Sequence, residues 1–344
     1  MPRLRPSMMH RPACLAPALA AALMLTACAA DSGPGALPPD DGTDACRTQA
    51  AALDRSAEFF AVPLVAGGVA VIGAGGVLGT RPGVIGALVW GATSAAAAVT
   101  AVAYVDQRRR EAAGNEAALA TAVGNDIDRE NAGLAQSQAA LDSVLDCRLR
   151  EARRVQEAAR AGAIQRAQAE AQLARMRAQA ERDLAMSRAI EQRVQARAAD
   201  LDAGVAAVAE ARPAPPPRPA VTVRPARPVP LQAAPVPSAP PVAATPTVAA
   251  RQEVRVRPAR NPDFVAVETP AGQPLGFAPA AVFSIPASQT RAIAMPAMAP
   301  AADAAPAARL RTLASTNIVR RDNFREAVGD LQRVVSSGGF ELGT

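Results

Sequence analysis

The chain has 344 residues, of which 37 are Lys or Arg and 31 are Asp or Glu, and its formal net charge is +6. His10 is the only histidine and lysine is absent, which excludes His-based triads and Lys nucleophiles from the rest of the chain. Aromatic residues make up 3% of the sequence, so the large side chains that dominate core packing are scarce. We therefore expect a mainly α-helical protein that is not an enzyme and has no catalytic residue, metal site or cofactor.

Residues 1–27 have the parts of a bacterial secretory signal: a basic start, an apolar run from about Ala13, and small residues at its end. The run ends in Leu25-Thr26-Ala27-Cys28, which resembles the lipobox of bacterial lipoproteins at all four positions. The resemblance implies cleavage before Cys28, acylation of this cysteine and attachment to membrane lipid. Ala29 rather than Asp follows it, which in this class favours the outer membrane, facing the periplasm. An ordinary cleaved signal with a coincidental cysteine is the alternative.

An exported chain meets an oxidising compartment, in which cysteines pair. Cys14 leaves with the signal and Cys28 carries lipid under this interpretation, which leaves Cys46 and Cys147. We expect these two to form an intramolecular disulfide; an interchain bridge or free thiols are the alternatives. Export also leaves no reason to expect a nucleic-acid partner, despite the net positive charge.

A flexible tether is predicted for residues 28–43, which are rich in the turn formers Asp, Gly and Pro. An amphipathic helix is predicted over residues 44–61, with Asp44 as its cap. Its apolar residues recur at spacings of four, three, four and three, which places them on one face. They are Cys46, Ala50, Leu53, Ala57 and Phe60. We expect this face to pack against another helix.

Residues 62–105 contain two uncharged runs, Val62 to Gly79 and Val84 to Val105, of 18 and 22 residues. Each is close to the roughly 20 residues that cross a bilayer as a helix. Small residues recur every four positions, a spacing that lets helices approach closely. They are Gly75, Gly79, Gly83, Ala87, Gly91 and Ala95. The pattern loosely resembles the glycine-zipper hairpins of envelope lipoproteins. It predicts either a membrane-inserted hairpin or a packed hairpin or oligomer core outside the bilayer.

Residues 106–212 lack proline and abound in Ala, Glu, Gln and Arg, which predicts a helical, coiled-coil region. The segment Arg166 to Glu170 recurs eleven residues later as Arg177 to Glu181, a period that fits a nearly straight helix. Leu173 and Leu184 occupy the same place in the two copies. We expect the charged rows of this repeat to be a solvated face.

The predicted disulfide requires this region to double back. If the hairpin turns near residue 82, Cys147 lies 29 residues beyond the point opposite Cys46, about 43 Å along an unbroken helix. A turn at residues 131–133 would bring the two cysteines together. We therefore predict a small bundle of residues 44–61, 106–130 and 134–150, with Leu134, Leu141 and Leu145 in its core. One long helix is the alternative if no disulfide forms.

Residues 213–308 are rich in Pro and Ala, and the first half is also rich in Arg, which predicts a disordered, semi-rigid and basic linker. It can serve as a solvated spacer or contact the cell wall or another anionic polymer. Two short apolar islands, residues 263–265 and 281–285, can form a strand or bind a partner, but they do not indicate a domain.

A docking helix is predicted within residues 309–344, with Asp322 or Asn323 as its cap and its end at residues 336–339. Its apolar residues form one stripe, and they are Phe324, Val328, Leu331 and Val335. A single helix cannot bury its own apolar face. The stripe therefore either packs back on the bundle or binds a partner protein.

The predicted function follows from the lipid anchor, because no catalytic pocket is indicated. We expect a structural scaffold or tether of the cell envelope that presents the basic Pro-rich arm and the C-terminal helix to an unidentified envelope protein. The alternative is a glycine-zipper homo-oligomer that forms a membrane pore or a component of a secretion channel. A chaperone-like role of the Ala-rich helix is a third alternative.

Overall fold

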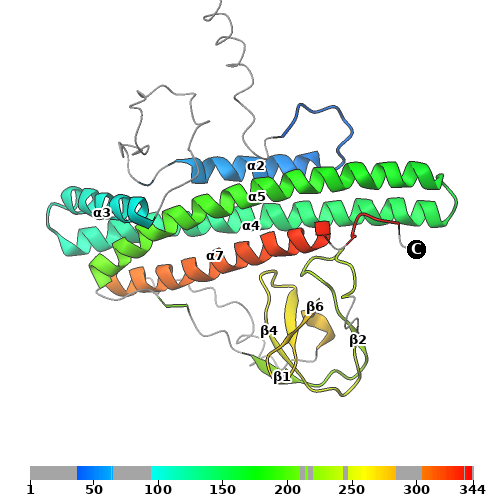
Figure 1. Ribbon diagram of the computed structural model, residues 1–344. Coiled ribbons are helices and arrows are strands. Elements are labelled where there is room, and N and C mark those ends of the chain that lie inside the picture. Colours follow the sequence, from blue (N-terminus) through cyan, green and yellow to red (C-terminus); the bar gives the residue numbers. More distant parts are fainter. Residues whose placement is uncertain are drawn as a thin grey trace, which may run out of the picture.

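The computed structural model describes residues 37–62, 64, 94–209, 214–215, 220–242, 247–283, 304–336 and 338–342. Within these residues, five helices pack side by side and a small sheet lies against one side of them (Figure 1). The helices are α2 (Arg47–Ala61), α3 (Ser94–Glu111), α4 (Glu116–Arg160), α5 (Arg166–Ala209) and α7 (Pro306–Ser336). The prediction of a mainly α-helical protein is confirmed.

The long helices α4 and α5 form an antiparallel pair at the centre of the bundle, and α2 and α7 lie on opposite sides of this pair (Figure 1). The predicted packing face of α2 is buried, with Leu53 fully buried and Phe60 3% exposed. Leu134, Leu141 and Leu145 are also fully buried, as predicted. The bundle core is therefore built on the helical spacings seen in the sequence.

The chain doubles back at residues 112–115, and the prediction of a turn at residues 131–133 is wrong. Gly114 has a φ of 79°, and the side chain of Asn115 accepts a hydrogen bond from the Ala118 backbone N–H (3.0 Å), which caps α4. α4 then runs unbroken through Gly133, where a Cβ atom would lie 2.5 Å from Cε1 of Phe59. Gly133 thus serves the close approach of α2, and it does not form a turn.

A second break, around Gly162 with a φ of 70°, separates α4 from α5, so the predicted helical region of residues 106–212 consists of three helices. The 11-residue repeat lies on α5. Leu173 is 1% exposed and Leu184 is 6% exposed, so both lie in the core. The charged residues of the repeat form exposed pairs, Arg166 with Glu170 and Arg177 with Glu181. These pairs form the solvated face that was predicted.

The C-terminal helix is longer than predicted. α7 begins at Pro306, and Asn323, one of the two predicted cap residues, lies inside the helix and is 4% exposed. The helix ends at Ser336, as expected. The stripe of Phe324, Val328, Leu331 and Val335 is buried in the same core as α2, α4 and α5. The stripe therefore packs on the bundle, which is the first of its two predicted alternatives. These side chains are not a free partner-docking face.

The largest correction concerns the predicted disordered linker. Residues 221–279 contain a four-stranded antiparallel sheet of order β1-β4-β5-β6 and a two-stranded pair, β2-β3. The strands are β1 (Val221–Val223), β2 (Val229–Pro230), β3 (Thr247–Val248), β4 (Val254–Pro258), β5 (Phe264–Glu268) and β6 (Pro274–Pro279), and a short 3₁₀ helix, η2 (Ala280–Val282), follows. We call residues 220–242 and 247–283 the β module.

The β module has its own apolar core, which explains why a Pro-rich segment folds. The register places Val256 opposite Val267, so that one face of β4 and β5 is apolar and packs against residues such as Leu231 and Val248. The prolines do not interrupt the ladder, because Pro258 ends β4 and Pro274 and Pro279 begin and end the edge strand β6.

The bundle also contains part of the predicted hydrophobic hairpin. Residues 94–105 of the second uncharged run belong to α3, and Ala101 and Tyr104 of this helix are buried. Among the described residues, no helix is both long and apolar enough to cross a membrane. Residues 63 and 65–93 of the predicted hairpin, with Gly75, Gly79, Gly83, Ala87 and Gly91, lie outside the described residues, whereas Ala95 lies in α3.

Candidate functional site

The start of α2 is fastened to α4 by the disulfide between Cys46 and Cys147, which confirms the predicted pairing. Both cysteines are buried, and 101 residues separate them in the sequence. Asp44 caps the turn that leads into α2, because its carboxylate accepts the Cys46 backbone N–H at 2.9 Å. The described chain begins only seven residues earlier, at Leu37, and leads back towards Cys28. The disulfide therefore fixes the point at which the predicted lipid tether joins the folded body.

A buried arginine reinforces this junction. Nη2 of Arg148 donates to Oδ2 of Asp44 at 2.9 Å, and Nε donates to Oδ2 of Asp183 at 2.9 Å. The side chains of Arg148 and Asp183 are 2% and 1% exposed. Burial alone would raise the pKa of Asp44, but the hydrogen bonds and the charge of Arg148 outweigh it and hold this pKa below its ordinary value. We call Asp44, Cys46, Cys147, Arg148 and Asp183 the tether junction.

The opposite face of α4 holds the β module. Gln138, Asp142, Asp146 and Arg153 follow one another at spacings of four, four and seven, so they share one side of the helix. Asp146 accepts the Ser238 backbone N–H at 2.9 Å, and Arg153 donates to the Ser238 carbonyl oxygen at 2.6 Å. These bonds tie the loop after β2 to the bundle.

Arg260, in the loop between β4 and β5, is the centre of this contact. Its side chain is fully buried and donates from Nε to Oδ1 of Asp142 on α4 (3.0 Å) and from Nη1 to Oδ2 of Asp330 on α7. Gln138 donates to its carbonyl oxygen at 3.2 Å. Burial raises the pKa of Asp142, and the charge of Arg260 opposes this rise. We call Arg260, Asp142, Asp330, Asp146 and Arg153 the module latch.

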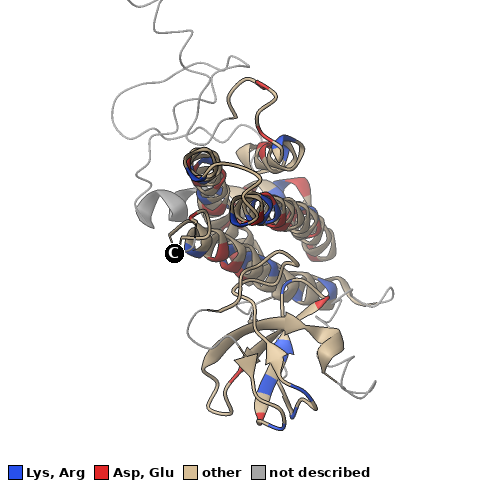
Figure 2. Cartoon of the chain, turned by 90° about the vertical axis from the view of Figure 1, so that its right-hand side faces the viewer, with Lys and Arg blue, Asp and Glu red and all other residues tan. Residues whose placement is uncertain are grey.

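The tether junction and the module latch lie on opposite sides of the bundle. In Figure 1, α2 lies along the upper side and the β module hangs below α4 and α7, and the view turned by 90° in Figure 2 shows the same order. Figure 2 also shows acidic and basic residues interspersed over the helices. The described fold thus separates the start of α2 from the sheet by the thickness of the bundle.

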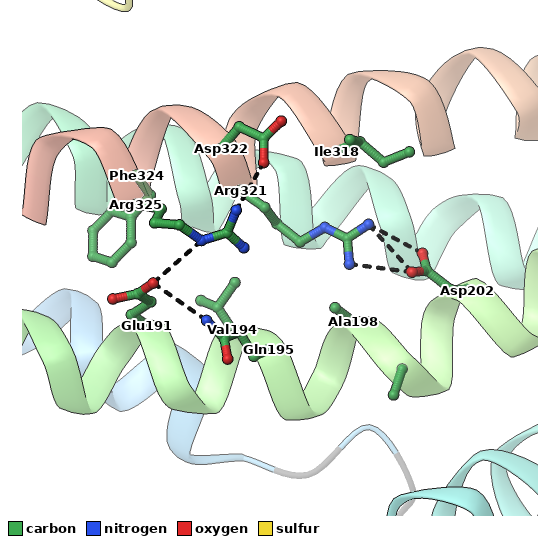
Figure 3. A pocket seen from close by; sticks show the side chains of 11 residues that line it. Glu191, Val194, Gln195, Ala198, Asp202, Ile318, Arg321, Asp322, Phe324 and Arg325 are labelled. Atoms are coloured by element: carbon green, nitrogen blue, oxygen red, sulfur yellow. Dashed lines mark hydrogen bonds and ion pairs between the residues drawn. The ribbon is translucent and has the colours of Figure 1, made fainter. Parts of the chain in front are cut away.

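A shallow groove of about 390 Å³ lies between α5 and α7 (Figure 3). Its charged side chains pair with one another: Arg321 with Asp202 at 3.1 Å, and Arg325 with Glu191 at 3.4 Å and with Asp322 at 3.1 Å. No thiol, hydroxyl or imidazole lines it. The groove therefore offers charge pairs that join two helices, and no nucleophile with a base.

Of the two junctions, the tether junction was predictable in part from the sequence and the module latch was not. Cys46, Cys147 and Asp44 were predicted from the sequence, but Arg148 was not, although it follows Leu141 and Leu145 at core spacing. No local pattern marks Arg260, because Asp142 and Asp330 lie 118 and 70 residues away in the sequence. The lipidation site Cys28 lies outside the described residues.

Comparisons with known proteins do not assign the chain to a family. No family model, no curated protein sequence and no solved structure matches it. In the part of the chain that the structure describes, no group of three or more His, Cys, Asp or Glu residues is arranged to hold a metal ion.

Proposed function

We propose that this chain is a lipoprotein of the bacterial cell envelope, acylated at Cys28, whose helical bundle is a rigid scaffold for the β module. The observation that carries the proposal is the placement of the tether junction and the module latch on opposite faces of the bundle (Figure 1). Each junction combines a long-range tie with a buried arginine. Such an arrangement supports holding one part of a molecule in a set orientation to another, and it does not support catalysis.

The lipobox-like Leu25-Thr26-Ala27-Cys28 supports the anchor, and the disulfide of Cys46 and Cys147 supports an oxidising compartment. Fifteen residues, 29–43, lie between the proposed lipid and the tether junction. Fully extended, they reach at most about 50 Å. With Ala29 after the cysteine, we place the protein at the outer membrane, facing the periplasm.

The β module replaces the extended arm as the element that is presented to a partner. Arg224, Arg227 and Arg251 are exposed on its surface, and the sheet is fixed on the side away from α2. Exposed arginines favour an acidic partner, such as a cell-wall polymer, or an envelope protein with an acidic surface. α7 contributes to holding the module, through Asp330, rather than to binding the partner.

Two measurements test the proposal. Metabolic labelling with a palmitate analogue should mark the wild-type chain and not Cys28→Ala, and the native protein should float with outer-membrane vesicles. Wild-type protein should sediment with purified cell wall, and replacing Arg224, Arg227 and Arg251 with Gln should weaken this binding. The matched control removes the same charge from the exposed α5 residues Arg166, Arg175 and Arg188. An unacylated, freely soluble native protein would refute the anchor, and equal loss in both charge variants would refute the module surface.

A further inference from the structure

The exposed side of α3 changes from apolar to charged along the helix. Val102 is 62% exposed and Ala103 is also exposed, whereas the exposed residues of the last two turns include Asp106, Arg109 and Arg110. The boundary lies at the end of the uncharged run of residues 84–105. Exposed aliphatic side chains beside exposed arginines on one helix are typical of a helix that contacts the lipid–water interface.

Buried contacts fix which side of α3 faces outward. Tyr104 is fully buried, and its hydroxyl donates to Oδ2 of Asp126 on α4 at 2.8 Å. Arg108 pairs with the same carboxylate at 2.8 Å. Gly204 of α5 leaves room for the tyrosine ring, since a Cβ there would lie 2.8 Å from Cε1 of Tyr104. α3 therefore cannot rotate to bury Val102 without breaking these contacts.

Val62 lies at the edge of the same part of the bundle. It is 64% exposed, and its carbonyl oxygen accepts a hydrogen bond from Arg197 of α5. Leu64, two residues later, packs against the core cluster that contains Tyr104. Among the described residues, only three large hydrophobic side chains are exposed, Val62, Val102 and Val282. Two of the three thus lie before and after residues 65–93 in the sequence, Val62 before them and Val102 in α3.

We propose that Val62, Val102, Arg109 and Arg110 form a lipid-contact surface that rests on a bilayer containing anionic lipids; this inference rests on the proposed membrane anchoring. Anionic lipid is favoured as the occupant by three features. The surface has exposed aliphatic side chains, exposed arginines lie next to them, and residues 63–93 carry a single charge, that of Arg81. Acyl chains bind membranes stably when a second contact adds to them. The surface supplies this second contact and sets the α3 side of the bundle against the bilayer.

The test uses full-length, acylated protein with one introduced cysteine. With Cys28 acylated and Cys46 and Cys147 joined, Val102→Cys supplies the free thiol of the mature chain, which is labelled with an environment-sensitive fluorophore. In vesicles of phosphatidylethanolamine and phosphatidylglycerol, the label at position 102 should shift to the blue and be quenched by lipid-borne quenchers. The matched control, Ala174→Cys, is exposed on α5 at the other end of the bundle and should show neither effect.

A second arm separates the surface from the anchor. Full-length Cys28→Ala should bind anionic vesicles weakly, and adding Arg109→Gln and Arg110→Gln should lower its partition coefficient about 25-fold, roughly fivefold per arginine. The control charge changes are Arg166→Gln and Arg175→Gln, which should leave partitioning unchanged. If acylated protein floats with vesicles but position 102 stays in water, the anchoring stands and the lipid-contact surface is refuted. If the label at position 102 is shielded from water in the absence of vesicles, this position contacts a second copy of the chain. That result would also refute the lipid-contact surface.

Discussion

Replacing Arg260 with methionine tests whether the module latch stabilises the whole protein. The Arg260 side chain is fully buried, and its partner Asp330 is fully buried as well. Removing one member of such a pair leaves a buried charge without compensation, which costs about 3 to 5 kcal/mol. Arg260→Met leaves Asp142 without its arginine, whereas Asp330 keeps its pair with Arg333. We therefore expect a loss near the lower end of this range.

Urea unfolding followed by far-ultraviolet circular dichroism measures the loss, and limited proteolysis of the β module reports whether the latch itself opens. The control is Arg166→Met, which breaks an exposed pair with Glu170 and should change the free energy of unfolding by about 0.5 kcal/mol or less. Replacing Arg260, Asp142 and Asp330 together with apolar residues should recover most of the loss, because no charge then remains buried. A loss under about 1 kcal/mol for Arg260→Met, or no recovery in the triple variant, would show that the latch is not a desolvated ion pair.

Three further outcomes are expected. Asp44→Asn should destabilise the protein at neutral pH, because a carboxylate with a lowered folded-state pKa stabilises while it is ionised. The difference should shrink as the pH falls from 3.8 towards the lower folded-state pKa, and urea titrations that give the same difference at pH 7 and pH 3 would contradict this. Replacing Cys46 and Cys147 with Ala opens a loop of 101 residues and should lower the free energy of unfolding by about 4 to 5 kcal/mol. A loss below about 1 kcal/mol would mean that the tether junction does not depend on the disulfide. Gly133→Ala places a Cβ atom 2.5 Å from Phe59 and should lower the free energy of unfolding by about 1 to 3 kcal/mol. At Gly124 the nearest atom to an added Cβ is 3.8 Å away, so Gly124→Ala should raise the free energy of unfolding by about 0.5 to 1 kcal/mol. In thermal unfolding, the first variant should therefore melt at a lower temperature than the wild type and the second at a higher one.

Local periodicity predicted the parts of the fold that depend on short-range spacing. The face of α2 that ends in Phe60 and the leucines at 134, 141 and 145 are buried as the helical period requires. Glycine was ambiguous in this sequence, because the same residue can end a helix or let two helices touch. Gly114 does the first and Gly133 does the second, and the partner that decides between them, Phe59, lies far away in the sequence.

The β module could have been predicted in part. Val254 and Val256 alternate with Arg255 and Arg257, and residues 264–267 are an apolar run; both patterns are strand signals. The abundance of proline outweighed these signals, although the prolines that lie in strands are at strand ends or in short or edge strands. The buried arginine of the module latch could not have been predicted, since its carboxylates come from helices on either side of the module in sequence.

The two junctions meet on a short stretch of α4. Cys147 and Arg148 face α2, whereas Asp142 and Asp146 face the β module, so both sets of contacts lie within about 9 Å along the helix. A pulling force applied between the residues before Asp44 and the sheet would therefore pass straight across α4, through one covalent bond and two buried ion-pair clusters. The remaining length of the bundle would carry little of that load, so the molecule should yield first where the sheet is held by non-covalent bonds alone.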